Sequence, residues 1–300
     1  MDKVIHYLQF VRPANIITAL ADILAGFSIA YASTYYIMNE VPHGIYLALF
    51  CLLLATAFLY AGGIIMNDVF DAKTDAIERP ERIIPSGKIS KDKAIGLGLG
   101  ALVLGIVAAF FVSWLSGLLA LFIALFALSY DGLTKDFLFL GPFNMALCRA
   151  LNLCLGISIV MPVLALCWYL AFIPLFYIIA VTLISKGEVH GGNNRLLKAA
   201  FVFYVLAILS FFVLNPVPPF HPLSAALFIL FLVVVIFRSL MKALTLKTPE
   251  TVRHAVKKGI LGLIILDAAF VAGYVGFGYG VIMLVLLMAS LRLGKRFAVT

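Results

Sequence analysis

The residues best suited to chemistry lie in the segment from Asn67 to Ser90, which directly follows a long apolar run. Three aspartates of this segment, Asp68, Asp71 and Asp75, are spaced at i, i+3 and i+7. If the apolar run is a helix that continues through them, all three project from one face and repel one another. A divalent cation between them would offset the repulsion, and a ligand set made only of oxygen suits Mg²⁺. The spacing predicts a metal site; the alternative is a solvated acidic helix end.

Basic side chains follow the aspartates in the same segment. Arg79, Arg82 and Lys88 lie within it, and guanidinium and ammonium groups are well suited to binding phosphate oxygens. Their position next to the aspartates indicates that they bind a diphosphate beside the metal.

Apolar helices must position this segment, because 64% of the 300 residues are hydrophobic and only 12% are charged. Runs of about 20 apolar residues recur along the chain, as in membrane-spanning helices, and lipid forces such runs to be helical. The sequence predicts an all-α, polytopic transmembrane helical bundle of nine or ten spans in a single domain, residues 1–300. The first run is too long for a signal-peptide core and is expected to remain as a span. The expected spans are 14–37, 44–66, 94–112, 115–130, 143–163, 168–185, 198–214, 222–240, 258–276 and 279–292.

The distribution of positive charge predicts the orientation. Of the 22 lysines and arginines, all but Arg149 lie at the chain ends or in alternate loops. The positive-inside rule therefore puts both termini and the polar loops in the cytoplasm, and we expect an integral protein of a bacterial inner membrane. The net charge of +8 is then a feature of the membrane surface that attracts lipid headgroups or a diphosphate, and no nucleic-acid partner is expected.

Arg149 is the basic residue that falls inside a predicted span. A charge at the centre of a span is costly, so its side chain should face the bundle interior. Together with Asn144 and Asn152 it forms a polar stripe that would line a cavity and approach a diphosphate or an acceptor. The alternative is a buried ion pair with Asp22 or Asp267.

The first polar segment resembles a known motif. Asn67, Asp68, Asp71 and Asp75, followed by Arg79-Pro80, Arg82 and Pro85-Ser86-Gly87, resemble the first aspartate-rich motif of the UbiA superfamily of intramembrane prenyltransferases. Supporting matches are Arg12-Pro13 with Asn15, and Tyr130-Asp131 with Lys135, and the resemblance runs from about residue 10 to 200.

This resemblance implies a helical bundle around a cavity that opens sideways to lipid, in which two aspartate-rich motifs hold Mg²⁺ against an isoprenyl diphosphate. The reaction it implies is transfer of the isoprenyl group to a small aromatic or polar acceptor. The implied metal or diphosphate ligands are Asn67, Asp68, Asp71 and Asp75, with Glu188 as a further metal ligand. The implied phosphate contacts are Arg79, Arg82 and Lys135. Beside them we expect substrate contacts from Asn15, Tyr130, Asn144, Arg149, Lys186 and Asn194, and catalytic roles for Asp68, Asp71, Asp75, Glu188 and His190.

The second motif departs from the family pattern. Lys186 matches a basic residue that flanks the family's second aspartate cluster, but Gly187, His190 and Asn194 stand where aspartates are expected, and Glu188 is the one carboxylate of the segment. Three explanations are open. Glu188 and His190 complete a weaker or single-metal site, or His190 is a base that takes a proton from the acceptor, or the site has kept binding and lost catalysis.

This variant is similar to the UbiA-like EboC proteins of bacterial gene clusters. The residues that carry the similarity are the run Lys186 to Asn193 and, in the fifth span, Gly141-Pro142, Asn144, Cys148-Arg149 and Asn152. Two function classes follow: a Mg²⁺-dependent prenyltransferase, and a non-catalytic lipid- or isoprenoid-binding or transport protein built on the same fold.

Overall fold

The computed structural model describes residues 10–189, 191–215 and 218–296, and every regular element in these ranges is a helix. The prediction of an all-α chain is confirmed. The elements are α2 (Pro13–Met38), α3 (Ile45–Phe70), α4 (Ala72–Glu78), α5 (Lys91–Phe110), α6 (Trp114–Ser129), the π-helical turn η1 (Tyr130–Thr134), α7 (Leu140–Ile157), α8 (Met161–Cys167), the 3₁₀ turn η2 (Trp168–Ala171), α9 (Phe172–Ser185), α10 (Asn194–Val213), α11 (Pro222–Leu246), α12 (Pro249–Tyr274) and α13 (Phe277–Arg296).

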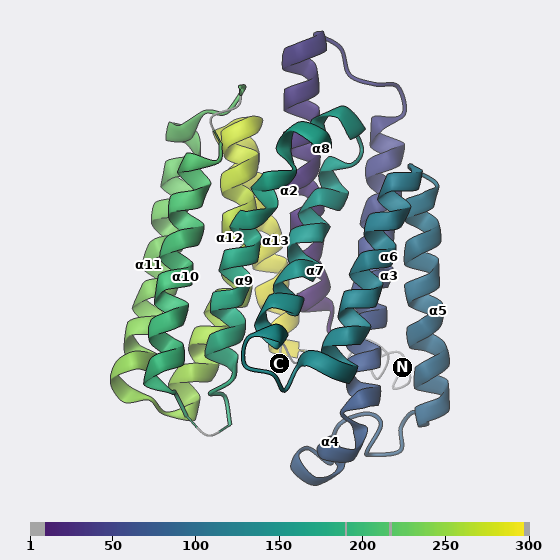
Figure 1. Ribbon diagram of the computed structural model, residues 1–300, viewed down its shortest axis with the longest axis vertical. Helices are drawn as coiled ribbons and strands as arrows, with labels where there is room; N and C mark the ends of the chain where they lie inside the picture. Colours follow the sequence, from purple (N-terminus) through teal and green to yellow (C-terminus); the bar gives the residue numbers. More distant parts are fainter. Residues whose placement is uncertain (1–9, 190, 216–217, 297–300) are drawn as a thin grey trace.

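Long apolar helices run side by side through the molecule (Figure 1). Nine helical segments of the described ranges are long and apolar enough to cross a membrane. α12 is equally long and packs against α2, α9, α11 and α13, although Lys257, Lys258 and Asp267 interrupt its apolar run. The described part of the chain is therefore a polytopic bundle of nine or ten spans, as the sequence predicts.

The helix of the predicted span 258–276 already begins at Pro249, and the predicted spans 143–163 and 168–185 are divided at the wrong place. α7 ends at Ile157, whereas the apolar run predicted a span from 143 to 163. A new helix, α8, begins at Met161 and has Pro162 in its first turn, where proline is tolerated because its missing N–H would be unpaired there. The chain then returns across the bundle through α8, η2 and α9 in succession. Hydropathy could not detect this break because the turn itself is apolar.

Small residues let α2 and α7 pack with their backbones close together. A Cβ atom on Gly26 would lie 2.5 Å from the carbonyl oxygen of Leu153, and one on Gly156 would lie 2.7 Å from that of Ile23. Glycine at both positions removes this clash, as is common where membrane helices pack. The close packing of α2 and α7 brings their polar side chains into contact inside the bundle.

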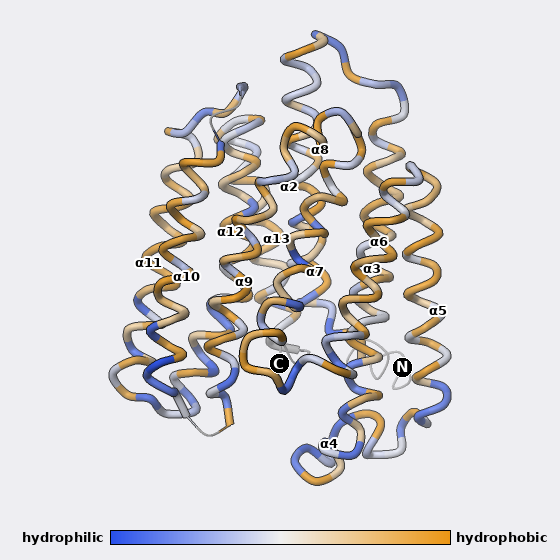
Figure 2. Tube along the Cα trace, in the orientation of Figure 1, coloured by the Kyte–Doolittle hydropathy of each residue, from blue (hydrophilic) through white to orange (hydrophobic). Residues whose placement is uncertain are grey.

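The polar segments that the sequence singled out lie at one end of the bundle. α4, the turn after α6 and the described parts of the α9–α10 loop are at the lower end in Figure 1. Figure 2 shows hydrophilic stretches gathered at this end, while the helix bodies are mostly hydrophobic. The fold therefore brings residues 67–90, 130–136, 186–189 and 191–195 to the same end of the molecule.

Candidate active site

The aspartates of the first motif divide into two groups. α3 carries Asn67 and Asp68 and ends at Phe70, so that Asp71 lies between α3 and α4 and Asp75 lies on α4. The prediction that the three aspartates project from one face is wrong. Seven residues make nearly two helical turns, which brings Asp68 and Asp75 to one side, whereas Asp71 at the helix junction contacts residues on the other side.

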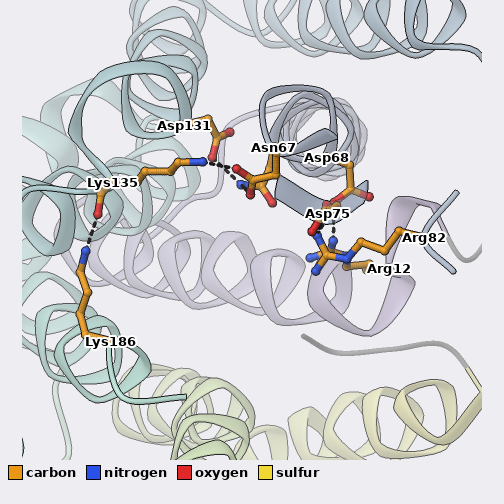
Figure 3. Close-up of polar contacts among 9 residues, drawn as sticks. Arg12, Asn67, Asp68, Asp75, Arg82, Asp131, Lys135 and Lys186 are labelled. Atoms are coloured by element: carbon orange, nitrogen blue, oxygen red, sulfur yellow. Dashed lines mark hydrogen bonds and ion pairs between the residues drawn. The ribbon is translucent and has the colours of Figure 1, made fainter. Parts of the chain in front are cut away.

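The first group joins Asp68 and Asp75 to two arginines (Figure 3). The carboxylate of Asp68 lies 2.5 Å from the guanidinium of Arg12 and 3.5 Å from that of Arg82, which also donates to Asp75 at 2.7 Å. Burial lowers the pKa of Arg12, and the neighbouring Asp68 opposes this shift. The two carboxylates and the two guanidinium groups balance in charge. Their ion pairs connect the start of α2 to α3, α4 and the loop after α4.

The second group surrounds Asn67 on the opposite side of α3 (Figure 3). The Nδ2 atom of Asn67 donates to Asp131 Oδ1 at 2.7 Å and to Asp71 Oδ2 at 3.4 Å. Asp71 also forms an ion pair with Lys135. This group therefore combines two carboxylates, one amide and a lysine from α3, η1 and the residue after η1.

The turn η1 places Asp131 and Lys135 next to α3. Its i→i+5 hydrogen bond runs from the backbone N–H of Lys135 to the carbonyl of Tyr130 over 2.9 Å, and such π turns often occur at functional sites. The side-chain amide of Asn144 on α7 lies 2.9 Å from Thr134 Oγ1 and so fixes the turn from behind. Asn144 and Tyr130 thus act on the geometry of the site, and their predicted contact with substrate stays a prediction.

The second motif reaches this group through Lys186. The ammonium group of Lys186, directly after α9, donates to the backbone carbonyl of Lys135. Burial lowers the pKa of Lys186, and nearby Asp136 opposes the shift. The fold therefore brings together two predicted phosphate contacts, Lys135 and Lys186, that lie about 50 residues apart in the sequence.

No described hydrogen bond or ion pair joins the side chain of Glu188 to the first-motif aspartates. This side chain is half-buried, which raises its pKa, and the positive charges of Arg79 and Arg253 act in the opposite direction. His190, which the sequence paired with Glu188, lies outside the described residues.

Two further predicted substrate contacts lie at helix starts. Asn15 is in the first turn of α2, where its backbone N–H donates to the Arg12 carbonyl at 2.9 Å. Asn194 is the first residue of α10 and is exposed. No described hydrogen bond connects the side chain of Asn15 or Asn194 to the group around Asn67.

Arg149 forms a buried ion pair with Asp22. This is the alternative that the sequence offered to a substrate contact in a cavity. The guanidinium of Arg149 lies 2.6 Å from Asp22 on α2 and stacks over the ring of Tyr60 at 4.9 Å. Asn152 donates to the same carboxylate at 2.9 Å, and Thr56 donates to Asn152 at 2.9 Å. Because Arg149 is only 3% exposed, its guanidinium is held inside the bundle by α2 and α3.

Comparison with known proteins identifies the family. The model of the UbiA prenyltransferase family matches residues 23–240. The chain belongs to this family. The match starts within α2 and extends into α11, so that it includes the polar residues described above except Arg12, Asn15, Asp22 and Arg253.

Relatives with similar sequences include archaeal digeranylgeranylglyceryl phosphate synthases. The protein of this name from Saccharolobus solfataricus is 33% identical over 150 residues, which cover 50% of each chain. The one from Methanococcoides burtonii is 36% identical over 138 residues, which cover 45% of this chain and 48% of the relative. The alignment thus spans about half the length of these curated relatives.

Solved structures share the fold along nearly the whole chain. A structure described as digeranylgeranylglyceryl phosphate synthase in membranes has a TM-score of 0.66 at 24% identity, covering 92% of this chain and 99% of its own. A UbiA homolog from Aeropyrum pernix has a TM-score of 0.65 at 12% identity, covering 89% and 96%. A UbiA homolog from Archaeoglobus fulgidus bound to GPP and Mg²⁺ has a TM-score of 0.51 at 15% identity, covering 97% and 99%.

The UbiA fold implies Mg²⁺, and the donor groups around Asn67 fit this ion. Within the described ranges, no three Asp, Glu, His or Cys side chains lie close enough together to hold a metal ion without further ligands. Asn67 and Asp71 nevertheless present an amide and a carboxylate that are 3.4 Å apart. Mg²⁺ is usually held by one or two carboxylates together with substrate phosphates, so this incomplete oxygen set is what a shared site requires. The predicted metal roles of Asp68, Asp75 and Glu188 stay predictions.

Two residues of the site were given no role from the sequence. Arg12 and Asp131 both stand in motif matches, Arg12-Pro13 and Tyr130-Asp131, but neither was predicted as a site residue. Arg12 contacts Asp68 across 56 positions of sequence, and Asp131 contacts Asn67 across 64. The available signal was a charged residue at the end of an apolar run, which alone does not identify its partner.

Proposed function

We propose that this UbiA family protein transfers an isoprenyl group from an isoprenyl diphosphate to an acceptor in a Mg²⁺-dependent reaction. The observation that carries the proposal is the group of Asn67, Asp71 and Lys135 at one end of the bundle. The ammonium group of Lys186 donates a hydrogen bond to the backbone carbonyl of Lys135 in this group. The group combines oxygen ligands for a divalent cation with two ammonium groups for phosphate oxygens.

The residues of this group have separate parts in the proposed reaction. Asn67 and Asp71 would hold Mg²⁺, which when bound supplies positive charge to the departing diphosphate. Lys135 and Lys186 bind diphosphate oxygens and stabilise the negative charge that develops as the bond to the isoprenyl carbon breaks. The apolar helix faces beyond α3 and η1 exclude water from the allylic carbon.

Arg12 and Arg82 have an indirect part in the proposal. They hold Asp68 and Asp75 by ion pairs and so fix the junction of α3 and α4, at which Asp71 lies. We propose that they position Asp71 and that Arg79, at the end of α4, contacts phosphate.

The acceptor that we propose is polar and carries a glyceryl phosphate group. The name of the archaeal relatives, digeranylgeranylglyceryl phosphate synthase, favours this over an aromatic acceptor. The positive charges of Arg79 and Arg253 act to lower the pKa of the half-buried Glu188, and guanidinium groups bind phosphate well. The proton of the acceptor hydroxyl would be taken by His190 or Glu188.

The finer predictions on branch and location remain part of this proposal. The altered segment from Lys186 to Asn193 supports the EboC branch, while the relatives reported above are archaeal synthases. We propose that residues 1–300 act as one membrane unit with the site and both termini in the cytoplasm of a bacterial cell. The alternate distribution of basic loops supports this orientation.

Release of diphosphate by purified protein in nanodiscs tests the activity. We expect Mg²⁺-dependent release from geranyl, farnesyl or geranylgeranyl diphosphate in the presence of a glyceryl phosphate acceptor, and its loss by at least about 100-fold in Asp71→Asn and Lys135→Met. Asp92→Asn is a matched control, because Asp92 is exposed at the start of α5. If no donor is bound or turned over with any divalent metal, the proposal is refuted.

A second candidate is a non-catalytic protein that binds or transports isoprenoid lipids. The observation in its favour is that no described hydrogen bond or ion pair joins Glu188, the one carboxylate of the second motif, to the group around Asn67. Binding of an isoprenyl diphosphate without turnover, for every acceptor tried, would support this candidate over the enzyme.

A further inference from the structure

Asp131 is a buried carboxylate that forms no ion pair among the described residues. Asp68, Asp71 and Asp75 each form an ion pair with an arginine or lysine, whereas Asp131 has none among the described residues. It is 7% exposed and accepts one hydrogen bond, from the amide of Asn67 at 2.7 Å. A buried charge without an ion-pair partner is costly, and the one described ammonium group beside Asp131, that of Lys135, is already paired with Asp71.

The direction of the Asp131 side chain follows from its backbone. The π turn η1 turns it toward α3 at the end of α6, and Asn144 on α7 supports the turn through Thr134. On α3 the same amide nitrogen of Asn67 contacts both Asp131 and Asp71, at 2.7 and 3.4 Å. The carboxylates of Asp131 and Asp71 are thus already brought together at the amide group of Asn67 by the fold.

Lys135 does not neutralise both carboxylates. Its ammonium group is paired with Asp71, and that of Lys186 is bonded to the backbone carbonyl of Lys135. A divalent cation between Asp71 and Asp131 would balance the second carboxylate. Hard oxygen ligands of this number and kind suit Mg²⁺ when substrate phosphate and water fill the remaining positions.

We propose that Asp131 is a further ligand of the divalent cation, together with Asn67 and Asp71, and that it supplies the negative charge missing from the second motif. This inference rests on the proposed function, because it concerns the same cation and the same diphosphate. It assigns the compensating carboxylate to η1, and it leaves Glu188 outside the cation site.

Binding of Mn²⁺, measured by electron paramagnetic resonance, tests the assignment without a need for turnover. The protein in nanodiscs is titrated with Mn²⁺ in the presence and absence of geranyl diphosphate. We expect Asp131→Asn to weaken Mn²⁺ binding at least about tenfold, since even the residues that support metal ligands contribute that much. Asp136→Asn is the matched control, because Asp136 is an exposed aspartate five positions further on, and it should stay within twofold of wild type.

Two more variants make the result decisive. Asp131→Glu keeps the carboxylate and should retain Mn²⁺ binding, whereas Asp131→Ser should lose it, which gives a comparison if Asp131→Asn does not fold. Glu188→Gln should leave Mn²⁺ affinity within twofold; a tenfold loss there would assign the missing ligand to Glu188 and overturn the inference.

The outcomes separate this inference from the proposed function. If wild type binds Mn²⁺ and geranyl diphosphate and all folded Asp131 variants bind Mn²⁺ equally well, Asp131 is not a ligand but the proposed function stands. If wild type binds neither, both the proposed function and the inference fail.

Discussion

The buried pair of Arg149 and Asp22 should dominate the stability of the bundle interior. We expect Asp22→Asn to leave the guanidinium of Arg149 without its carboxylate, in a site where Arg149 is 3% and Asp22 1% exposed. Breaking one side of a buried ion pair costs about 3–5 kcal/mol. Arg149 would keep its contacts with Thr18, to whose carbonyl it donates at 3.0 Å, and with the ring of Tyr60, so the lower part of this range applies.

Removal of both charges should be far less harmful than removal of one. Replacement of a buried ion pair by apolar or neutral groups is often neutral or stabilising. The double variant Asp22→Asn, Arg149→Met should therefore recover at least about 2 kcal/mol relative to Asp22→Asn. This coupling separates an ion pair from two independent packing effects.

The measurement is reversible unfolding in mixed detergent micelles, followed by circular dichroism, for wild type, both single variants and the double variant. Thr34→Val is the control. Its buried hydroxyl donates only to its own helix, at 2.7 Å from the Ala30 carbonyl, and its loss should cost about 1 kcal/mol or less. Additive effects of the two single variants would refute the reasoning.

The same variants address the cavity role that the sequence left open for Arg149. If the ion pair is its main interaction, folded Arg149→Met should bind geranyl diphosphate with an affinity close to that of wild type. A selective loss of donor binding in a protein of unchanged stability would show that Arg149 contacts substrate.

Three further predictions follow from the packing and charge of individual residues. Asp267→Asn should change the unfolding free energy by less than about 1 kcal/mol, measured as above, since Asp267 has no ion-pair partner in the described structure and its removal leaves no cation unpaired. Gly26→Leu should prevent stable folding, seen as loss of a monodisperse peak in size-exclusion chromatography, because its Cβ alone would meet the Leu153 carbonyl at 2.5 Å, whereas Gly96→Leu should be tolerated because nothing lies within 4 Å of a Cβ there. Burial raises the pKa of Glu188 in the folded protein, so the folded protein binds this proton more tightly than the unfolded chain does and loses stability as pH rises through the ordinary glutamate range. Glu188→Gln should therefore flatten the pH dependence of the thermal unfolding temperature between about pH 4 and 7. An unchanged pH profile would contradict this prediction.

Helix class and approximate span positions were accessible from local sequence because each depends on the composition of one short segment. α2, predicted at 14–37, runs from Pro13 to Met38, and α11, predicted from 222, begins at Pro222. The break between α7 and α8 was not accessible, since the residues of the turn are as apolar as those of the helices.

The composition and motifs by themselves determined that the chain is a polytopic membrane protein with a polar site after its second span, and the UbiA resemblance followed from the same residues. Only the tertiary structure decided how the charges pair. Asp68 with Arg12, Asn67 with Asp131 and Asp22 with Arg149 are contacts between residues 56, 64 and 127 positions apart. The physical reason is that hydropathy and helical period act within a segment, whereas the choice between a metal, a phosphate and a salt-bridge partner depends on which helices the packing of small residues brings together.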